Sequence, residues 1–119
     1  MEHLWFLNTS VAVRCSSAHS DRSLSVLEHR APLHDSPPLH VHTGEDEVFV
    51  VLDGELRVQV GTVEQSAGPG TVLVAPKNVP HTYRVDSSGG ARWLTVTGPG
   101  DFEQFVRTMA RPAAGTGVA

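Results

Sequence analysis

The residues best suited to chemistry lie in one short stretch, HVHTGEDEVFVVLDG, at positions 40–54. His40 and His42 are two residues apart, so on an extended strand both imidazoles project from the same face. Carboxylates follow within a few residues, and imidazole combined with carboxylate suits iron, manganese, nickel, copper or zinc. Glu47 shares the parity of the apolar residues that follow it, whereas Glu45 falls in the expected bend before the strand. The spacing therefore favours Glu47 as a ligand and leaves Glu45 open.

A further ligand has to come from another strand. His81 opens the strand-like run HTYRV directly after the loop PKNVP, where a side chain can be aimed into the interior. Tyr83 has the same parity as His81, so it either contributes to catalysis beside the metal or packs in the core. Three imidazoles and one carboxylate leave positions open on a six-coordinate ion for substrate, water or dioxygen. The residues therefore predict one divalent metal ion (Fe, Mn, Ni, Cu or Zn) per chain, held by His40, His42 and His81 together with a carboxylate, for which Glu47 is favoured and Glu45 stays open.

The remaining four histidines have no such spacing, and we interpret them as surface or loop residues: His3, His19, His29 and His34.

Short strand-like runs separated by turn signals fill most of the chain, which favours an all-β barrel or double-sheet jelly roll. Asp53-Gly54 is typical of a two-residue hairpin turn between neighbouring strands. The run from Leu56 to Val60 alternates apolar and polar residues, as a half-buried strand does. Expected strands cover 4–14 with a break at 8–10, 23–28, 48–52, 56–60, 62–65, 71–75, 81–85 and 92–97.

One segment has helical periodicity. Asp101 can cap a helix whose apolar face carries Phe102, Phe105, Val106 and Met109, and Pro112 ends the run. We expect this short C-terminal helix to pack outside the sheets, and residues 112–119 to form a disordered tail.

Composition excludes several classes of function. The formal charge is −4 and basic residues are scattered, so nucleic acid and anionic membranes are not expected partners. No apolar stretch approaches the roughly 20 residues of a membrane span. Cys15 is the only cysteine, which excludes an intrachain disulfide and favours a cytoplasmic location.

The motifs at 40–54 and 70–85 resemble those of the cupin family. The first motif, two histidines one residue apart, a glutamate after four residues and a glycine after six more, is complete in His40, His42, Glu47 and Gly54. In the second motif the glycine, proline and histidine are present at 70, 76 and 81. Asn78 replaces the inner glycine, a mild change because asparagine enters the left-handed region readily, and Val85 replaces an asparagine.

This resemblance implies a single cupin domain over residues 1–111, folded as a double-stranded β-helix (a jelly-roll barrel), and it resolves the choice of ligand in favour of Glu47. It also implies a homodimer in which the N-terminal strands, residues 4–14, pair between barrels. The sequence of the two motif regions is similar to that of the quercetinase-like branch of small cupins, which act on flavonols with dioxygen. Small cupins that act as polyketide cyclases look similar over the same stretch.

The implied substrate is a small aromatic or polyketide-like molecule bound to the metal through its oxygen atoms, with Glu47 as general base. A redox-active metal would then support dioxygenation, and a redox-inert one cyclisation or isomerisation. A non-catalytic binding module for a small molecule is the alternative outside enzymes.

Overall fold

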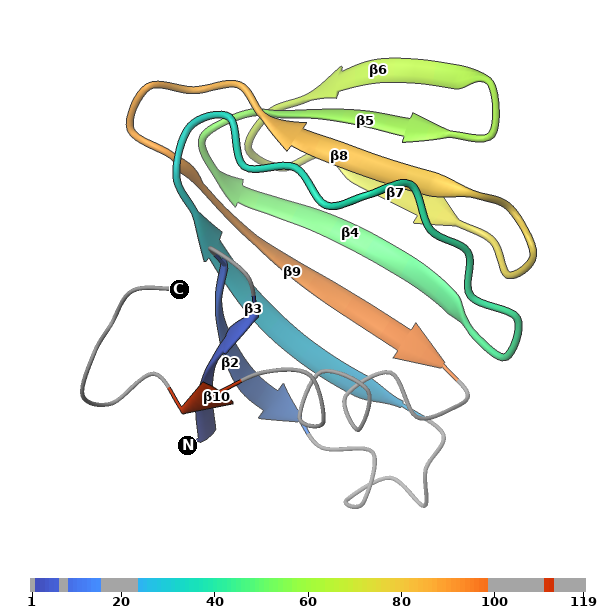
Figure 1. Cartoon of the computed structure of the whole chain (residues 1–119), viewed down its shortest axis with the longest axis horizontal. Helices are drawn as coiled ribbons and strands as arrows, with labels where there is room; N and C mark the ends of the chain where they lie inside the picture. Colours follow the sequence, from blue (N-terminus) through green and yellow to red (C-terminus); the bar gives the residue numbers. More distant parts are fainter. Residues whose placement is uncertain (1, 7–8, 16–23, 99–110, 113–119) are drawn as a thin grey trace.

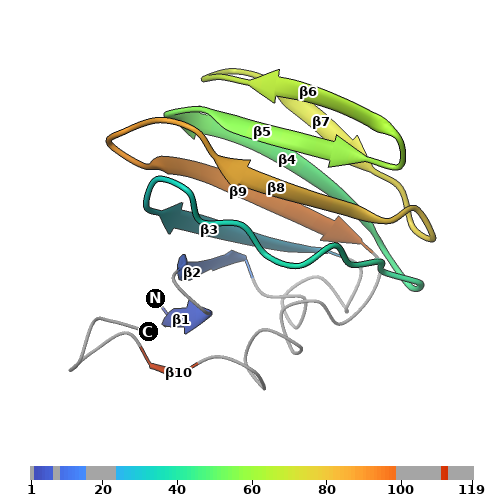
Figure 2. The ribbon, with the colours of Figure 1, turned by 45° about the horizontal axis from the view of Figure 1, so that its top comes forward.

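Two antiparallel β-sheets lie over one another as the two walls of a barrel (Figures 1 and 2). The computed structural model describes residues 2–6, 9–15, 24–98 and 111–112, and all regular structure in these ranges is β-strand. The larger sheet has the order β10 (Arg111–Pro112), β1 (Glu2–Phe6), β2 (Thr9–Cys15), β3 (Ser25–Ala31), β9 (Ala91–Gly98), β4 (Asp46–Asp53) and β7 (Val72–Ala75). The smaller sheet has the order β6 (Val63–Ala67), β5 (Leu56–Val60) and β8 (His81–Val85).

The strand ranges confirm most of the sequence-based expectations, including the alternation in β5. Of the break expected at 8–10, Thr9 and Ser10 instead lie in β2, and residue 8 is outside the described residues. The helix expected from Asp101 falls in 99–110, outside the described residues. Pro112, expected to begin the tail, lies in β10, and residues 113–119 are outside the described residues. The segment 4–14 pairs within its own chain, β1 with β2 and β2 with β3. Its pairing between two copies stays a prediction.

The connection at Asp53-Gly54 is a corner between the two sheets, and the hairpin predicted there is wrong. β4 pairs with β7 and β9, whereas β5 pairs with β6 and β8. Gly54 has a φ of 76°, but Asp53 is not among the residues with positive φ, as a hairpin of that type requires. The local turn signal was therefore correct about the bend and wrong about the partner strand.

Gly54 is required at this corner by both its backbone and its surroundings. A Cβ at Gly54 would collide with the carbonyl oxygen of Gly90, and its positive φ penalises any side chain. We expect Gly54→Ala to lower the free energy of unfolding by about 2 kcal/mol or more, and therefore to lower the midpoint of thermal unfolding. The matched control is Gly44→Ala, because a Cβ there meets nothing within 4 Å. Equal midpoints for the two variants in a circular-dichroism melt would contradict this assignment.

The apolar core fills the end of the barrel where the chain passes from the larger to the smaller sheet. Side chains of odd parity in β4 and β9 point inward, so Phe49, Val51 and Trp93 are buried, with at most 2% of each exposed. Leu56, Val58 and Val85 meet them from the smaller sheet. Glu47 and His81 lie at the other end of the same strands, where β4 and β8 begin. The core therefore closes one end and fixes the strands that carry the candidate ligands.

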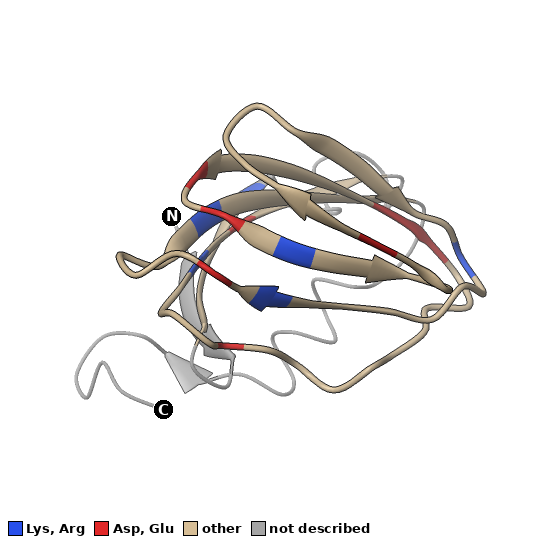
Figure 3. Ribbon diagram, turned by 90° about the horizontal axis from the view of Figure 1, so that it is seen from above, with Lys and Arg blue, Asp and Glu red and all other residues tan. Residues whose placement is uncertain are grey.

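Charged residues are interspersed over the strands, with basic and acidic positions mixed (Figure 3). In the described part of the chain, no helix is long and apolar enough to cross a membrane.

Candidate metal centre

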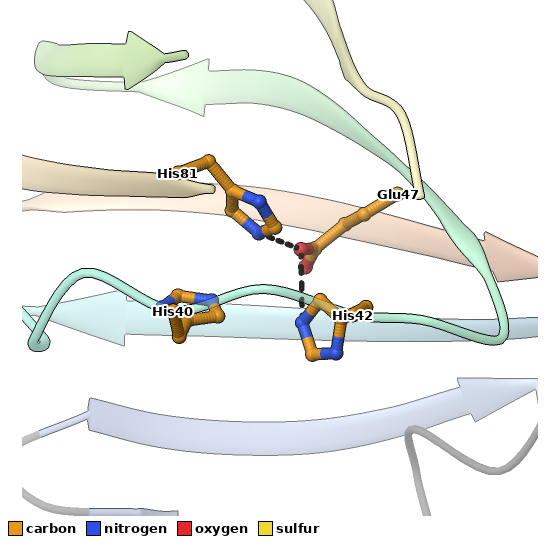
Figure 4. A group of neighbouring side chains, drawn as sticks. All are labelled: His40, His42, Glu47 and His81. Carbon is orange, nitrogen blue, oxygen red and sulfur yellow. Dashed lines mark hydrogen bonds and ion pairs between the residues drawn. The ribbon is translucent and has the colours of Figure 1, made fainter. Parts of the chain in front are cut away.

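The structure brings together the four side chains selected from the sequence. Each of His40, His42, Glu47 and His81 offers one ligand atom, and these four atoms lie within 4.8 Å of one another. The Nε2 atoms of His81 and His42 are 3.0 and 3.7 Å from Glu47 Oε1. Glu47 and His81 are buried, with 3% and 1% of each exposed, and the other two are half-buried. Figure 4 shows the four groups reaching one space from three separate segments.

The two histidines of the first motif are held beside the smaller sheet by backbone hydrogen bonds. His40 N donates to His81 O (3.1 Å) and His81 N donates to His40 O (2.8 Å), which forms an isolated antiparallel bridge. The amide of Asn78 donates to His42 O (2.7 Å). Asn78 has a φ of 67°, which confirms that asparagine takes the left-handed conformation in place of the inner glycine. The segment therefore runs alongside β8 and turns both imidazoles toward the interior.

Each imidazole has its outer nitrogen, Nδ1, next to an acceptor. His40 Nδ1 donates to Pro38 O (2.9 Å), and His81 Nδ1 donates to Val79 O (3.1 Å). His42 Nδ1 is 3.3 Å from Glu45 Oε1. An imidazole whose Nδ1 carries the hydrogen presents the Nε2 lone pair to a metal, and such orienting contacts are typical of metal-binding histidines. The donor set and its supports thus fit a divalent metal ion.

Glu45 and Asp46 lie in different places, and only the direction of Asp46 was predicted from the sequence. Glu45, the rival ligand, lies against the outer nitrogen of His42 and so is placed to orient that ring. Asp46 points away from Glu47, as its parity predicts, and its Oδ1 accepts a hydrogen bond from Lys77 N (2.9 Å).

Electrostatics in the group favour metal binding coupled to proton release. Burial lowers the pKa of His81, but the hydrogen bonds to Glu47 and the Val79 carbonyl and the charge of Glu47 outweigh burial, so the pKa is raised. Burial lowers the pKa of His42, and the neighbouring imidazoles lower it further. The charge of Glu47 acts in the opposite direction but does not outweigh them. The hydrogen bond between His81 Nε2 and Glu47 Oε1 occupies the nitrogen that would bind a metal, so the hydrogen on Nε2 has to leave before His81 can act as a ligand.

An aromatic wall leads inward from the four residues. The ring of Phe49 lies edge-on to His81 (6.3 Å between centroids), and Tyr83 follows it at 6.2 Å. Burial raises the pKa of the Tyr83 hydroxyl, against a hydrogen bond with Thr9, so the phenol stays protonated and can donate a hydrogen bond. Thr9 in turn donates to Asp35 Oδ2 (2.8 Å). Tyr83 therefore both packs against the core and faces the interior.

The position of His29 shows that its interpretation as a surface or loop residue was wrong. It lies on the inner face of β3 with 7% of its surface exposed, and its Nε2 is 2.8 Å from Thr95 Oγ1. The expected strand ended at residue 28, which left His29 in a loop, whereas β3 continues to Ala31. The period-two pattern of Ser25, Leu27, His29 and Ala31 was the signal available. By contrast, His34 lies exposed in a loop, as expected, and the side chains of His3 and His19 are outside the described residues.

The buried position of His29 gives a pH dependence to stability. Burial lowers its pKa from 6.5 to about 4, against the charges of Glu47 and Glu28. Because the folded-state pKa is depressed, the unfolded chain takes up the proton first as the pH falls below 6.5. Stability present above pH 6.5 is then lost progressively toward pH 4, by about 3 kcal/mol. In denaturant titrations of metal-free protein, we expect His29→Phe to lack this part of the acid slope. Parallel slopes for wild type and variant would contradict it.

The similarity of the chain to known proteins agrees with the geometry of the four clustered side chains. A family model described as a cupin domain matches residues 26–97, which include both motifs and the four clustered side chains. The chain belongs to the cupin family. The predicted double-stranded β-helix is thereby confirmed, as the similar solved structures also show.

Three proteins with similar sequences or structures were found for this cupin domain. It is 32% identical over 97 residues to quercetin 2,3-dioxygenase of Bacillus subtilis (strain 168), covering 82% of this chain and 28% of that protein. It is thus similar to little more than a quarter of that relative's length. TT1209 from Thermus thermophilus is 33% identical with a TM-score of 0.62, covering 66% of this chain and 74% of that one. A protein described as a predicted oxalate decarboxylase, from Thermotoga maritima, has a TM-score of 0.75 at 18% identity, covering 82% and 93%.

Proposed function

We propose that this cupin domain is a metal-dependent dioxygenase acting on a small, oxygen-rich aromatic substrate of the flavonol type. The observation that carries the proposal is the group of three imidazoles and one carboxylate, partly exposed on one side and backed by an aromatic wall. The similarity to quercetin 2,3-dioxygenase supports the substrate class. His40, His42, Glu47 and His81 are the proposed ligands of one divalent ion. When bound, such an ion lowers the pKa of a coordinated hydroxyl and, if redox-active, supports reaction with dioxygen.

Glu47 has the position and chemistry of the general base. Its carboxylate is buried among imidazoles and reaches the centre of the group, so a substrate hydroxyl there lies within its reach. His81 and His42 lie on either side of this carboxylate and can hold it while it carries the proton. Both atoms of dioxygen enter the product of a dioxygenase, so no external reductant has to be supplied.

The wall beyond the metal centre favours a flat aromatic ligand over a charged one. Phe49 and Val51 contribute apolar surface, and Tyr83 contributes a ring and a neutral hydroxyl. Binding of a sugar phosphate would favour a basic side chain at this wall. The inward-facing side chains of β4 and β9 in the described ranges include no Lys or Arg.

Oxygen uptake with quercetin tests the proposal. Metal-free protein is reloaded with Fe, Mn, Ni, Cu or Zn in separate samples, and dioxygen consumption is followed with an electrode. We expect uptake with at least one redox-active ion and none with zinc, which has no redox chemistry. Conversion of a polyketide-like substrate without oxygen uptake would replace the proposal with a cyclase or isomerase. Tight binding with no conversion under any metal would replace it with a binding module.

A further inference from the structure

A cavity of about 510 Å³ lies at the end of the larger sheet that is remote from the candidate metal centre. Its wall includes the end of β3, the start of β9 and the end of β4, which meet at one corner of the sheet (Figure 1). Asp53, in this wall, is six residues beyond Glu47 on β4, so the cavity lies about 20 Å from the candidate ligands. Its volume is within the range of sites for small molecules.

Two arginines, Arg30 and Arg92, line the cavity from neighbouring strands. They are direct partners in the antiparallel pairing of β3 with β9, and like charges in this arrangement repel one another. Their ion pairs within the described residues are with Glu28 alone, whose Oε2 lies 3.6 Å from Arg30 and 3.5 Å from Arg92. The other oxygen of Glu28 is 2.7 Å from Arg14. One carboxylate therefore serves three guanidinium groups, and the two contacts at the cavity are long.

A second pair of opposed arginines in this protein has its charges balanced. Arg57 and Arg84 are direct partners in the pairing of β5 with β8. Each has a carboxylate of its own at short range, since Arg57 Nε is 2.7 Å from Glu64 Oε1 and Arg84 Nε is 2.7 Å from Asp86 Oδ1. Such a partner is what the pair in the cavity lacks, so the cavity is the place where an anion from outside would supply it.

The other residues of the wall leave the two guanidinium groups accessible. Asp53 lies opposite Arg92 in the register, but its Oδ1 accepts a hydrogen bond from the Gly54 amide (3.0 Å), and in the described ranges no ion pair joins it to an arginine. Gly89 is exposed, and a Cβ there would meet nothing within 4 Å, so this turn does not block the approach of a ligand. Most N–H donors of the two guanidinium groups thus have no acceptor within the described residues.

We propose that this cavity binds the oxyanion group of a small organic molecule, a carboxylate or a phosphate, between Arg30 and Arg92. The planar guanidinium group can donate two parallel hydrogen bonds to either anion. Ala31, Pro32 and Ala91 supply apolar surface in the wall, which suits the organic part of such a ligand. The bound anion also offsets the repulsion between the two arginines. The site shares no residue with the metal centre, so this inference does not rest on the proposed function.

Nuclear magnetic resonance titration of isotope-labelled, zinc-loaded protein tests the site with three ligands that have the same ring. Benzoate carries a carboxylate, phenyl phosphate carries a phosphate, and benzamide is the neutral counterpart of benzoate. We expect the amide signals of Gly89, Gly90 and Ala91 to shift with at least one of the anions, and benzamide to bind about tenfold more weakly or worse. The anion that binds more tightly identifies the group. In Arg30→Gln and in Arg92→Gln the affinity should fall about tenfold or more.

Arg57→Gln is the matched control, because it removes one arginine of the balanced pair and should leave the affinity unchanged. Thermal melts confirm folding, and Arg30→Gln decides the test if Arg92→Gln does not fold, since the Arg30 side chain is 66% exposed. The proposal is overturned if neither anion shifts the signals of the 87–90 turn, if benzamide binds equally well, or if Arg30→Gln keeps the wild-type affinity. Shifts confined to the signals around His40 and His81 would place the anion at the zinc and overturn it as well.

Discussion

Replacing Glu47 with glutamine should abolish most turnover while leaving the metal in place. The amide oxygen of Glu47→Gln can still accept from His81 and approach a metal, but the side chain can no longer take a proton. General-base catalysis contributes about 10²- to 10⁴-fold, so we expect oxygen uptake with quercetin to fall by about that factor. Steady-state kinetics and elemental analysis of the same preparation provide the two measurements.

Asp46→Asn is the matched control for this change. Asp46 is adjacent in sequence and exposed, it points to the other side of β4, and an asparagine oxygen can still accept from Lys77 N. We expect its turnover to equal that of wild type. Full activity in Glu47→Gln would remove the general-base role, and quercetin affinity retained with no turnover in wild type would indicate a binding module.

Removing both histidines of the first motif should eliminate the stabilisation of the protein by metal. An ion that binds only the folded chain stabilises it by about 4 kcal/mol at a thousandfold excess over its Kd. We expect added metal to raise the unfolding midpoint of wild type and to leave that of His40→Ala/His42→Ala unchanged. Differential scanning fluorimetry with and without metal measures both shifts.

His34→Asn controls for the loss of an imidazole elsewhere. His34 is exposed and has a φ of 74°, a conformation that asparagine tolerates well. Its metal-induced shift should match that of wild type. A shift of wild-type size in His40→Ala/His42→Ala would place the metal at other residues.

Local sequence patterns predicted the part of the site that depends on parity, although they left Glu45 open until the resemblance to the cupin motifs favoured Glu47. The spacing of His40, His42 and Glu47 follows from strand geometry, and the structure places their ligand atoms together. The left-handed conformation of Asn78 could also be anticipated, because it depends on the residue's own side chain.

The remaining features depend on contacts between residues far apart in the sequence. The Asp53-Gly54 sequence is compatible both with a hairpin, in which the next strand pairs with β4, and with a corner, in which that strand joins the other sheet. The pairing of β4 with β9 and of β5 with β8 decides for the corner. The partner of His29 is 66 residues away, so no local pattern could show that its imidazole is satisfied inside the barrel. The orienting position of Glu45 depends on the bend before β4 and not on parity.

We propose that His40, His42, Glu47 and His81 bind one metal ion per chain. Elemental analysis by plasma mass spectrometry, on untagged wild type and on His40→Ala/His42→Ala, tests it most directly. We predict about one equivalent of iron, manganese, nickel, copper or zinc in wild type, lost in the variant. An absence of stoichiometric metal from wild type, even after reconstitution with each ion, would contradict it.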